Sequence, residues 1–381
     1  MKISPSTPLM SAKPRYELLD GLRGVAAFVV LWYHVFEAFA TGPTDQLLNH
    51  GYLAVDFFFI LSGFVVGYAY DDRWKGHMTT ADFFKRRLIR LQPMVVLGVV
   101  LGVVAFCAVG CEKWDHTHAS LTMVMLAMLL NLFLFPVVPG WDCEVRGNGE
   151  MFPLNGPNWS LFFEYIGNIM YALVLHRLSA KALSAVVAVS GALLAWFAVD
   201  NMSGSYHMGV GWTLADYNPL GGFLRVTFSF SAGLLMARWF KPMKIKGAFW
   251  ICAALLCVLL SMPFVGTESH PWLNGVYDAV CVIAVFPALL YMAASGSTTD
   301  RFSANVCEFL GNISYPVYVI HYPSMYIFYR WIWTGGYTFA QAWPVAAAIV
   351  AGNIILAWIV LKVYDEPVRR YLTRRFLTNV K

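Results

Sequence analysis

The stretch LDGLRGVAAFVVLWYHVFEAFA, residues 19–40, decides the fold class of this chain. It is mostly apolar, and it is long enough for an α-helix to cross the roughly 30 Å hydrocarbon core of a bilayer. It nevertheless contains Arg23 and His34. An ionisable side chain at membrane depth costs roughly 2.5–3.5 kcal/mol on insertion scales, and such residues mark substrate or proton pathways. The stretch therefore predicts a membrane-spanning helix with a functional role.

The composition of the whole chain is typical of a membrane protein. Of its 381 residues, 59% are hydrophobic and 13% are charged, whereas soluble proteins carry about 25% charged residues. Apolar runs of about 20 residues recur, while a β-barrel would show short alternating segments. The net charge of +5 does not indicate nucleic-acid binding, because the basic residues are spread over several loops. The sequence predicts an all-α, polytopic transmembrane bundle, with residues 1–381 forming one integral-membrane domain and no fused soluble domain.

Ten apolar runs are predicted to cross the membrane. They cover residues 19–40, 51–70, 91–110, 159–178, 181–199, 219–239, 247–263, 274–295, 309–329 and 340–362. An eleventh run, residues 119–137, is predicted to be a re-entrant or external helix, because a full crossing there would break the alternation of every later loop. The alternative is that another run, such as 247–263, does not cross. Glu366 and Pro367 are predicted to end the last span at the cytoplasmic surface.

The basic residues set the predicted orientation. Lys2, Lys13 and Arg15 precede the first run, and six further Lys or Arg residues lie between residues 73 and 90. The intervening loops contain no Lys or Arg; they are residues 41–50, 200–218, 264–273 and 331–339. The positive-inside rule therefore predicts that both termini are cytoplasmic. Because residues 1–16 are polar and the first run is as long as a full span, that run is predicted to be a signal anchor.

The cysteines and the external loops leave two questions open. No CxxC or His/Cys metal pattern is present, so no metal site is predicted. Cys111 and Cys143 fall in loops placed outside, where a disulfide is one alternative and two free thiols are the other. Segment 139–158 is the largest external loop, and it is predicted either to line an outward-facing opening or to be a solvated connector.

Arg23 and His34 form the first candidate group. Eleven residues at 100° each make three helical turns plus about 20°, so both side chains lie on one face, about 16 Å apart. Asp20 lies three residues before Arg23 and can pair with it. A buried imidazole takes and returns a proton near neutral pH, which suits general-base work on a hydroxyl. The alternatives are a snorkelling anchor for Arg23 and an interhelical hydrogen bond for His34.

The second candidate group is basic and lies in a predicted cytoplasmic loop over residues 83–93, which ends at Pro93. Arg87 and Arg90 are three residues apart, so they share a face if the stretch is helical. Guanidinium groups grip phosphate in bidentate fashion. The alternative is that these arginines only mark the cytoplasmic end of a membrane span, where basic residues are common.

Two further groups place polar residues inside apolar runs. Ser160 and Glu164 lie four residues apart on one face of the run that starts near Trp159. Ser314, Tyr318 and His321 follow a helical period in another run, and such a stripe must face the bundle interior or a wet cavity. These groups, and the weaker candidates Asp56 and Arg225, either contact a substrate or hold helices together by hydrogen bonds and ion pairs.

Taken in order, these stretches resemble the acyltransferase 3 family of integral-membrane acyltransferases. The stretches that carry the resemblance are residues 19–26 with His34, residues 58–64, Arg87 and Arg90 with Pro93, residues 159–161 with Glu164, and residues 313–315 with Tyr318 and His321. The order matches, and the resemblance covers nearly the whole chain. Each motif alone is weak, whereas five in order are specific.

The resemblance implies a fold, a reaction and a set of site residues. Members of the family move an acyl group, often acetyl, from cytoplasmic acyl-CoA to a hydroxyl of a sugar or glycan. The expected partners are acyl-CoA as co-substrate, a carbohydrate or glycolipid acceptor and membrane lipids, with no nucleic acid and no other cofactor. His34 is expected to deprotonate the acceptor hydroxyl, directly or through an acyl intermediate, and Glu164 or His321 to orient His34 or bind the sugar. The expected catalytic residues are His34, Arg23 and Glu164; the expected acyl-CoA-binding residues are Arg86, Arg87 and Arg90; the expected acceptor or supporting residues are Asp20, Asp56, Trp159, Ser160, Arg225, Ser314, Tyr318 and His321.

The main rival function is secondary transport, or flipping of lipid-linked glycans or small solutes. A transporter also needs many spans and charges inside the membrane. Transporters often show inverted repeats and paired broken helices, and the sequence shows neither. A non-catalytic membrane sensor or scaffold ranks last.

Overall fold

The computed structural model describes residues 16–76, 78–243, 245–298 and 300–377. Every named element in these ranges is helical, and strand-like pairing in them is limited to isolated β-bridges. The α-helices are α1 (Glu17–Glu37), α2 (Ala54–Trp74), α3 (Thr80–Ala108), α4 (Leu121–Leu132), α5 (Asn158–Leu173), α6 (Ala180–Val199), α7 (Asn218–Trp239), α8 (Ala248–Ser261), α9 (Trp272–Val280), α10 (Phe286–Ala294), α11 (Arg301–Ile320), α12 (Tyr322–Gly335), α13 (Phe339–Val360) and α14 (Glu366–Phe376). The basic residues outside the described ranges are Lys2, Lys13, Arg15, Lys244 and Lys381.

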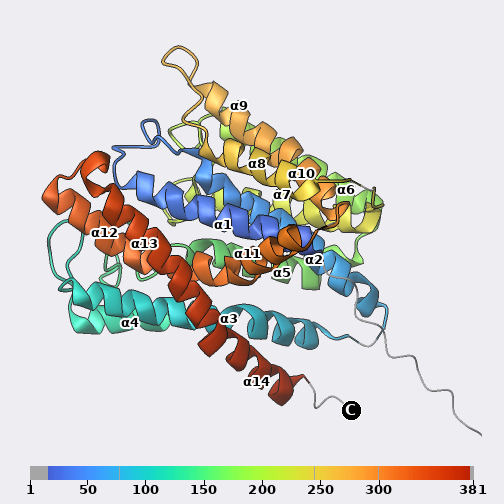
Figure 1. Cartoon of the computed structure of the whole chain (residues 1–381), viewed down its shortest axis with the longest axis horizontal. Helices are drawn as coiled ribbons and strands as arrows, with labels where there is room; N and C mark the ends of the chain where they lie inside the picture. The colour runs from blue at the N-terminus through green and yellow to red at the C-terminus, as the bar shows by residue number, and fades with distance from the viewer. Residues whose placement is uncertain (1–15, 77, 244, 299, 378–381) are drawn as a thin grey trace, which may run out of the picture.

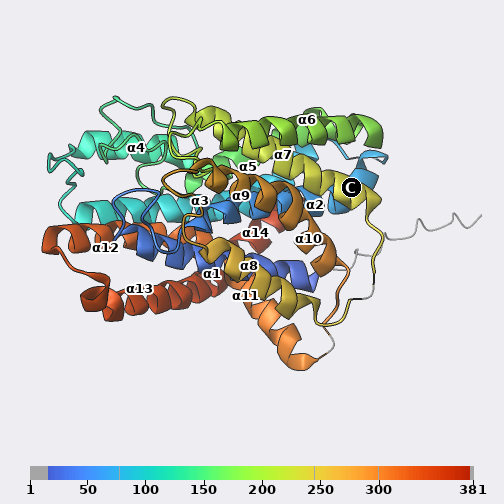
Figure 2. The same cartoon turned by 90° about the horizontal axis from the view of Figure 1, so that it is seen from above.

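The long helices run roughly side by side along the horizontal axis of Figures 1 and 2. Helix α1 packs against α11, α8 and α2, and α2 packs along α7. The start of α1, the end of α2 and α14 lie toward one end of the bundle, while α4 and α12 lie toward the other (Figure 1). The chain is therefore a multi-pass helical membrane bundle, as the sequence predicts.

Seven segments of the described chain are long and apolar enough to cross a membrane by themselves. The other three expected spans are shorter or interrupted. Helices α5 and α8 have 16 and 14 residues, and at 1.5 Å per residue these rise only about 21–24 Å. The third, residues 309–329, divides into α11 and α12 at His321.

A proline explains the break at His321. Pro323 has no N–H and its ring clashes with the carbonyl four residues earlier, which is that of Val319. The side chain of Asn155 fills the gap, because its Nδ2 donates to the Val319 carbonyl oxygen at 2.9 Å. This contact ties the start of α5 to the end of α11, where several of the predicted site residues lie.

The basic stretch 83–93 is helical, so the prediction of a loop there is wrong. Thr79 caps the start of helix α3, and its side chain forms a capping box with Asp82. Pro93 lies inside the helix. Arg87 and Arg90 therefore share one helix face, as expected for a helical stretch.

The segments that the sequence analysis places outside the membrane are partly buried, unlike a solvated connector. Helix α4 has 12 residues, too few to span the membrane, which agrees with the prediction for residues 119–137. In the loop before α5, Arg146 and Glu150 are buried. All seven cysteines are free thiols, so Cys111 and Cys143 do not form a disulfide.

The helix that contains the last predicted span continues past Glu366 and Pro367. A π-helical turn, Leu361–Asp365, connects α13 to α14, and the helix continues to Phe376. The wider turn lets a helix accommodate Pro367, which cannot donate to the preceding turn. The turn directs part of α14 toward α3.

Candidate functional site

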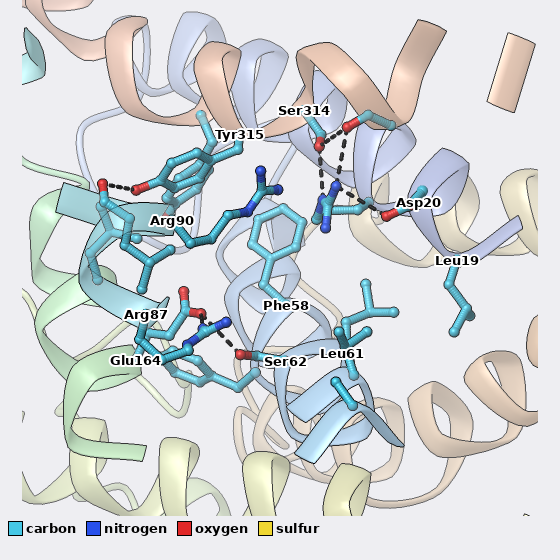
Figure 3. A pocket seen from close by; sticks show the side chains of 18 of the residues that line it. Leu19, Asp20, Phe58, Leu61, Ser62, Arg87, Arg90, Glu164, Ser314 and Tyr315 are labelled. Atoms are coloured by element: carbon cyan, nitrogen blue, oxygen red, sulfur yellow. Dashed lines mark hydrogen bonds and ion pairs between the residues drawn. The ribbon is translucent and has the colours of Figure 1, made fainter. Parts of the chain in front are cut away.

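A cavity of about 680 Å³ lies between α1, α2, α3, α5, α11 and α14, and Figure 3 shows part of its lining. Its size is within the roughly 300–1,000 Å³ typical of small-molecule sites. The arginines that line it are Arg23, Arg73, Arg87, Arg90 and Arg369. The opposite end is formed by the first turns of α2 and α5 and the end of α11, through Val55, Phe58, Ser160, Leu161 and Tyr318. The cavity can therefore hold a ligand with an anionic portion and a less polar one.

Arg23 is held in the cavity wall by α11. Its Nε donates to Ser314 Oγ at 2.8 Å, and its Nη2 donates to the Gly311 carbonyl oxygen at 3.1 Å. Nη2 also lies 3.2 Å from Asp20 Oδ1, which confirms the predicted pair. A Cβ on Gly311 would lie 2.7 Å from Cβ of Asp20, so glycine permits this close approach of α1 and α11.

Glu164 joins three helices in the same cavity (Figure 3). Its Oε1 accepts from Arg87 Nη2 at 2.6 Å and from Ser62 Oγ at 2.9 Å. Glu164 therefore neutralises Arg87, and it makes none of the described contacts with His34. The sequence left open whether Glu164 binds an arginine or a substrate, and the structure shows the arginine contact in a wall that a ligand can reach.

Unlike Arg87, which pairs with Glu164, Arg90 forms no ion pair with any described residue of the cavity. Its guanidinium lies 5.8 Å from the centroid of the Tyr315 ring, whose hydroxyl donates to the Leu91 carbonyl oxygen at 2.7 Å. Within the described ranges Arg90 has no carboxylate partner. Arg86, in contrast, does not line the cavity. Two of the three predicted acyl-CoA arginines thus face the cavity.

Ser160 and Tyr318 close the inner end of the cavity. Their hydroxyl oxygens lie 2.6 Å apart. Ser160 donates its one hydroxyl proton to the Pro157 carbonyl oxygen at 2.9 Å, so Tyr318 is the donor to Ser160. The Phe58 ring packs edge-on against Tyr318, with centroids 5.2 Å apart. These three side chains form a barrier between the cavity and the residues beyond it.

His34 lies beyond this barrier and does not line the cavity. The Tyr318 ring is 6.1 Å from that of His321, and the His321 ring stacks on His34 with centroids 5.4 Å apart. The His34 side chain is 16% exposed. His34 is therefore accessible, but it is separated from the basic cavity by two aromatic side chains.

The partner of His34 is Glu37, a residue that the sequence analysis did not single out. His34 Nδ1 lies 2.7 Å from Glu37 Oε2, and that oxygen also accepts from the Tyr329 hydroxyl at 2.7 Å. A carboxylate only accepts, so Nδ1 carries the proton and Nε2 of the neutral ring has a free lone pair. The three-residue spacing on α1 is the signal that could have revealed this pair.

His321 has the same tautomer for a different reason. Its Nδ1 donates to the Val317 carbonyl oxygen at 3.0 Å. Its Nε2 is buried and has no hydrogen-bond partner in the described chain. A buried nitrogen with an unused lone pair is costly to maintain. The stacked rings of His34 and His321 thus both keep a basic nitrogen free.

Asp56 and Arg225 form a buried ion pair outside the cavity. Arg225 Nη2 lies 2.7 Å from Asp56 Oδ2, and both side chains are 0% exposed. Arg225 also donates to the carbonyl oxygens of Val210 and Tyr52 at 2.7 and 2.8 Å, and it lies over the Trp159 ring. This geometry supports the structural alternative for Asp56, Arg225 and Trp159.

The structure thus divides the predicted site residues into two sets. Those that line the cavity are Asp20, Arg23, Arg87, Arg90, Ser160, Glu164, Ser314 and Tyr318. Those that do not are His34, Asp56, Arg86, Trp159, Arg225 and His321. The sequence analysis did not select two further residues: Glu37, which contacts His34, and Arg369, which lines the cavity.

Comparison with known proteins gives the family. A family model described as an acyltransferase domain matches residues 16–362. The acyltransferase MdmB of Streptomyces mycarofaciens is 26% identical, over 95% of this chain and 93% of its own length. Protein 2 in the picA locus of Rhizobium radiobacter is 36% identical over 49% of this chain and 96% of its own length.

A third relative is longer than this chain. A protein of Staphylococcus aureus (strain COL), named "Putative O-acetyltransferase", is 25% identical over 80% of this chain and 50% of its own length. This chain therefore matches about half of that relative. No solved structure matches the chain.

Proposed function

Because the chain belongs to the acyltransferase 3 family, we propose that it transfers an acetyl group from cytoplasmic acetyl-CoA to a hydroxyl of a sugar or glycan acceptor. The family assignment makes it a membrane acyltransferase and favours transfer over transport. The name of the staphylococcal relative supports acetyl as the group transferred. The proposed membrane is the bacterial inner membrane, with both termini cytoplasmic.

The donor is proposed to occupy the arginine-lined cavity. Phosphates of CoA are multiply charged, and guanidinium groups recognise them through paired N–H donors. Arg90 has no carboxylate partner in the described chain, and Arg73 is exposed. The less polar inner end, next to Tyr318, then suits the pantetheine arm and its thioester. The arrangement of charge in this cavity is the observation that carries the proposal.

His34 is proposed to act as the general base, with Glu37 as its positioning residue. Nε2 takes the proton of the acceptor hydroxyl while that oxygen attacks the thioester carbonyl. The tetrahedral intermediate then collapses, the C–S bond breaks, and the imidazolium returns its proton to the departing CoA thiolate. General-base help of this kind contributes about 10²–10⁴-fold.

Transfer requires the donor and the acceptor to meet at His34. The thioester must therefore pass Tyr318 and Phe58, and side-chain rotation at this barrier is part of the proposed cycle. The acceptor is proposed to approach His34 without entering the basic cavity. His321, with its free Nε2, is proposed to accept a hydrogen bond from the acceptor beside His34.

The test uses the purified protein in detergent with acetyl-CoA and a panel of methyl glycosides. Release of CoA that depends on a glycoside, with acetyl recovered as an ester, is the expected result. His34→Gln should abolish ester formation, while His270→Gln, at an exposed loop histidine, should not change it. Ester formation by His34→Gln at the wild-type rate would reject His34 as the base. No transfer from acetyl-CoA to any glycoside would contradict this choice of donor and acceptor.

A further inference from the structure

Arg369 reaches the cavity from a part of the chain that the family match does not include. The match ends at residue 362, and Arg369 lies on α14 (Glu366–Phe376), after the π-helical turn. The turn carries α14 against α3, the helix that bears Arg87 and Arg90. Figure 1 shows α14 near the end of the bundle where α1 starts.

The Arg369 side chain is fixed but only partly satisfied. Its Nη2 lies 2.7 Å from Oδ2 of Asp365, whose side chain is 2% exposed. Its Nε is buried and has no hydrogen-bond partner in the described chain. A buried charged donor without an acceptor is costly. Nε itself is not accessible to a ligand, but the Arg369 side chain is 23% exposed and lines the cavity.

Three positive charges converge at this end of the cavity. Arg90 experiences the repulsive charges of Arg23 and Arg369 and the attractive charge of Asp365. Arg23 is paired with Asp20, and Arg369 with Asp365. Among the described residues Arg90 forms no ion pair within 4 Å, and it lies beside the Tyr315 ring. Like charges in a partly buried cavity repel one another, and an anion between them offsets this repulsion. A bound anion would therefore stabilise the cluster.

We propose that Arg369 binds a phosphate of the acyl donor, so that α14 forms one wall of the donor site. This inference rests on the proposed function for the identity of the donor as acyl-CoA. In this proposal Arg90 and Arg369 together bind a phosphoryl group attached to a nucleotide. Arg23 closes the same cluster from α1.

Arg370 provides a matched control on the same helix. It is the next residue along α14, its side chain is 69% exposed, and it pairs with Glu366 at 2.8 Å. It does not line the cavity. Substituting either arginine removes one positive charge from the same helix, but only Arg369 faces the cavity.

The test measures binding of CoA itself to the detergent-purified full chain, so it does not depend on turnover. We expect Arg369→Gln to weaken CoA binding about 10-fold to 100-fold, as for loss of a hydrogen bond to a charged group. Arg370→Gln should leave the affinity unchanged, and Arg369→Lys should restore part of it. Pantetheine, which has no phosphate, should bind wild type and Arg369→Gln equally.

Each other outcome has a defined meaning. Equal CoA affinity for wild type and Arg369→Gln overturns the inference, and so does an equal loss of CoA and pantetheine binding, which would indicate a structural effect. Wild type that does not bind CoA overturns it as well. CoA binding that depends on Arg369, without acetyl transfer to any glycoside, supports the inference and counts against the proposed function alone.

Discussion

His34 and Glu37 are joined by a hydrogen bond of 2.7 Å between Nδ1 and Oε2, one turn apart on α1. The hydroxyl of Tyr329 donates to the same carboxylate oxygen. The two contacts hold the imidazole in one orientation and one tautomer, with Nε2 free. In the proposed mechanism, Glu37 acts through His34 and does not touch the substrate.

The first prediction concerns this pair. Glu37→Gln keeps a hydrogen-bond acceptor beside Nδ1 but removes the charge that stabilises the imidazolium formed during transfer. We expect kcat to fall about 10-fold to 100-fold, less than the full loss of general-base help, while KM for acetyl-CoA stays unchanged. The measurement is initial-rate kinetics of glycoside-dependent CoA release.

Tyr329→Phe is the companion variant, because it removes only the second hydrogen bond to Glu37. Its kcat should lie between those of wild type and Glu37→Gln. A rise in KM for acetyl-CoA with unchanged kcat in Glu37→Gln would place this residue in donor binding and reject the positioning role.

The second prediction separates structural charges from functional ones. Asp56→Asn leaves Arg225 buried without a compensating charge, and breaking a buried pair of this kind costs roughly 3–5 kcal/mol. Lys75→Gln, which breaks the exposed pair with Asp72, should cost under about 1 kcal/mol. Unfolding of the detergent-purified proteins by heat or denaturant measures both. Asp56→Asn with the stability of wild type, but without activity, would contradict a structural role.

These residues also show what the sequence could predict. Helical spacing along one segment identified the Asp20–Arg23 pair and the shared face of Arg87 and Arg90, because contacts three or four residues apart follow from helix geometry alone. The same reasoning should have found Glu37, three residues after His34. Hydrophobic run length gave the membrane bundle for the same reason, because bilayer thickness fixes the length of a span.

Other features depend on packing that no local pattern encodes. The partner of Asp56 lies 169 residues away in the chain, and only the packing of α2 on α7 brings the two together. Arg369 was missed because it follows Glu366 and Pro367, which were predicted to end the last span, and because a π-helical turn that the sequence does not reveal carries the helix onward. His34 is separated from the cavity by the rings of Tyr318 and His321. These lie outside α1, so a helical wheel of α1 cannot reveal them.

The third prediction concerns the barrier between the cavity and His34. Tyr318→Phe and Ser160→Ala each remove the 2.6 Å hydrogen bond between the two hydroxyls. If this bond helps to keep the donor thioester away from His34, each variant should release CoA several-fold faster in the absence of a glycoside. The double variant should resemble either single one, because residues that share a contact act non-additively.

Tyr315→Phe is the matched control for the barrier. Tyr315 also lines the cavity, but its hydroxyl donates to a backbone carbonyl of α3. The Tyr315→Phe variant should release CoA without a glycoside at close to the wild-type rate. Independent, additive effects of Tyr318→Phe and Ser160→Ala would show that their hydrogen bond is not the barrier.

The last prediction uses the buried loop carboxylate Glu150. Burial raises the pKa of Glu150 to about 7, and this effect outweighs the hydrogen bonds from Asn148 and Tyr326 and the charge of Arg146. The folded state therefore binds a proton more tightly than the unfolded chain, where the carboxyl has its ordinary pKa of 4.5. The contribution to stability is complete below pH 4.5 and is lost as the pH rises through about 7.

At about 1.36 kcal/mol per pKa unit, the loss is on the order of 3 kcal/mol. Glu150→Gln cannot ionise, yet it can still accept from Tyr326, so it should lack this loss and gain stability relative to wild type as the pH rises from 4.5 to 8. Thermal unfolding in detergent at both pH values measures the difference, with Glu268→Gln, at an exposed loop carboxylate, expected to track wild type. If the difference between Glu150→Gln and wild type were the same at both pH values, Glu150 would not titrate differently in the folded and unfolded states.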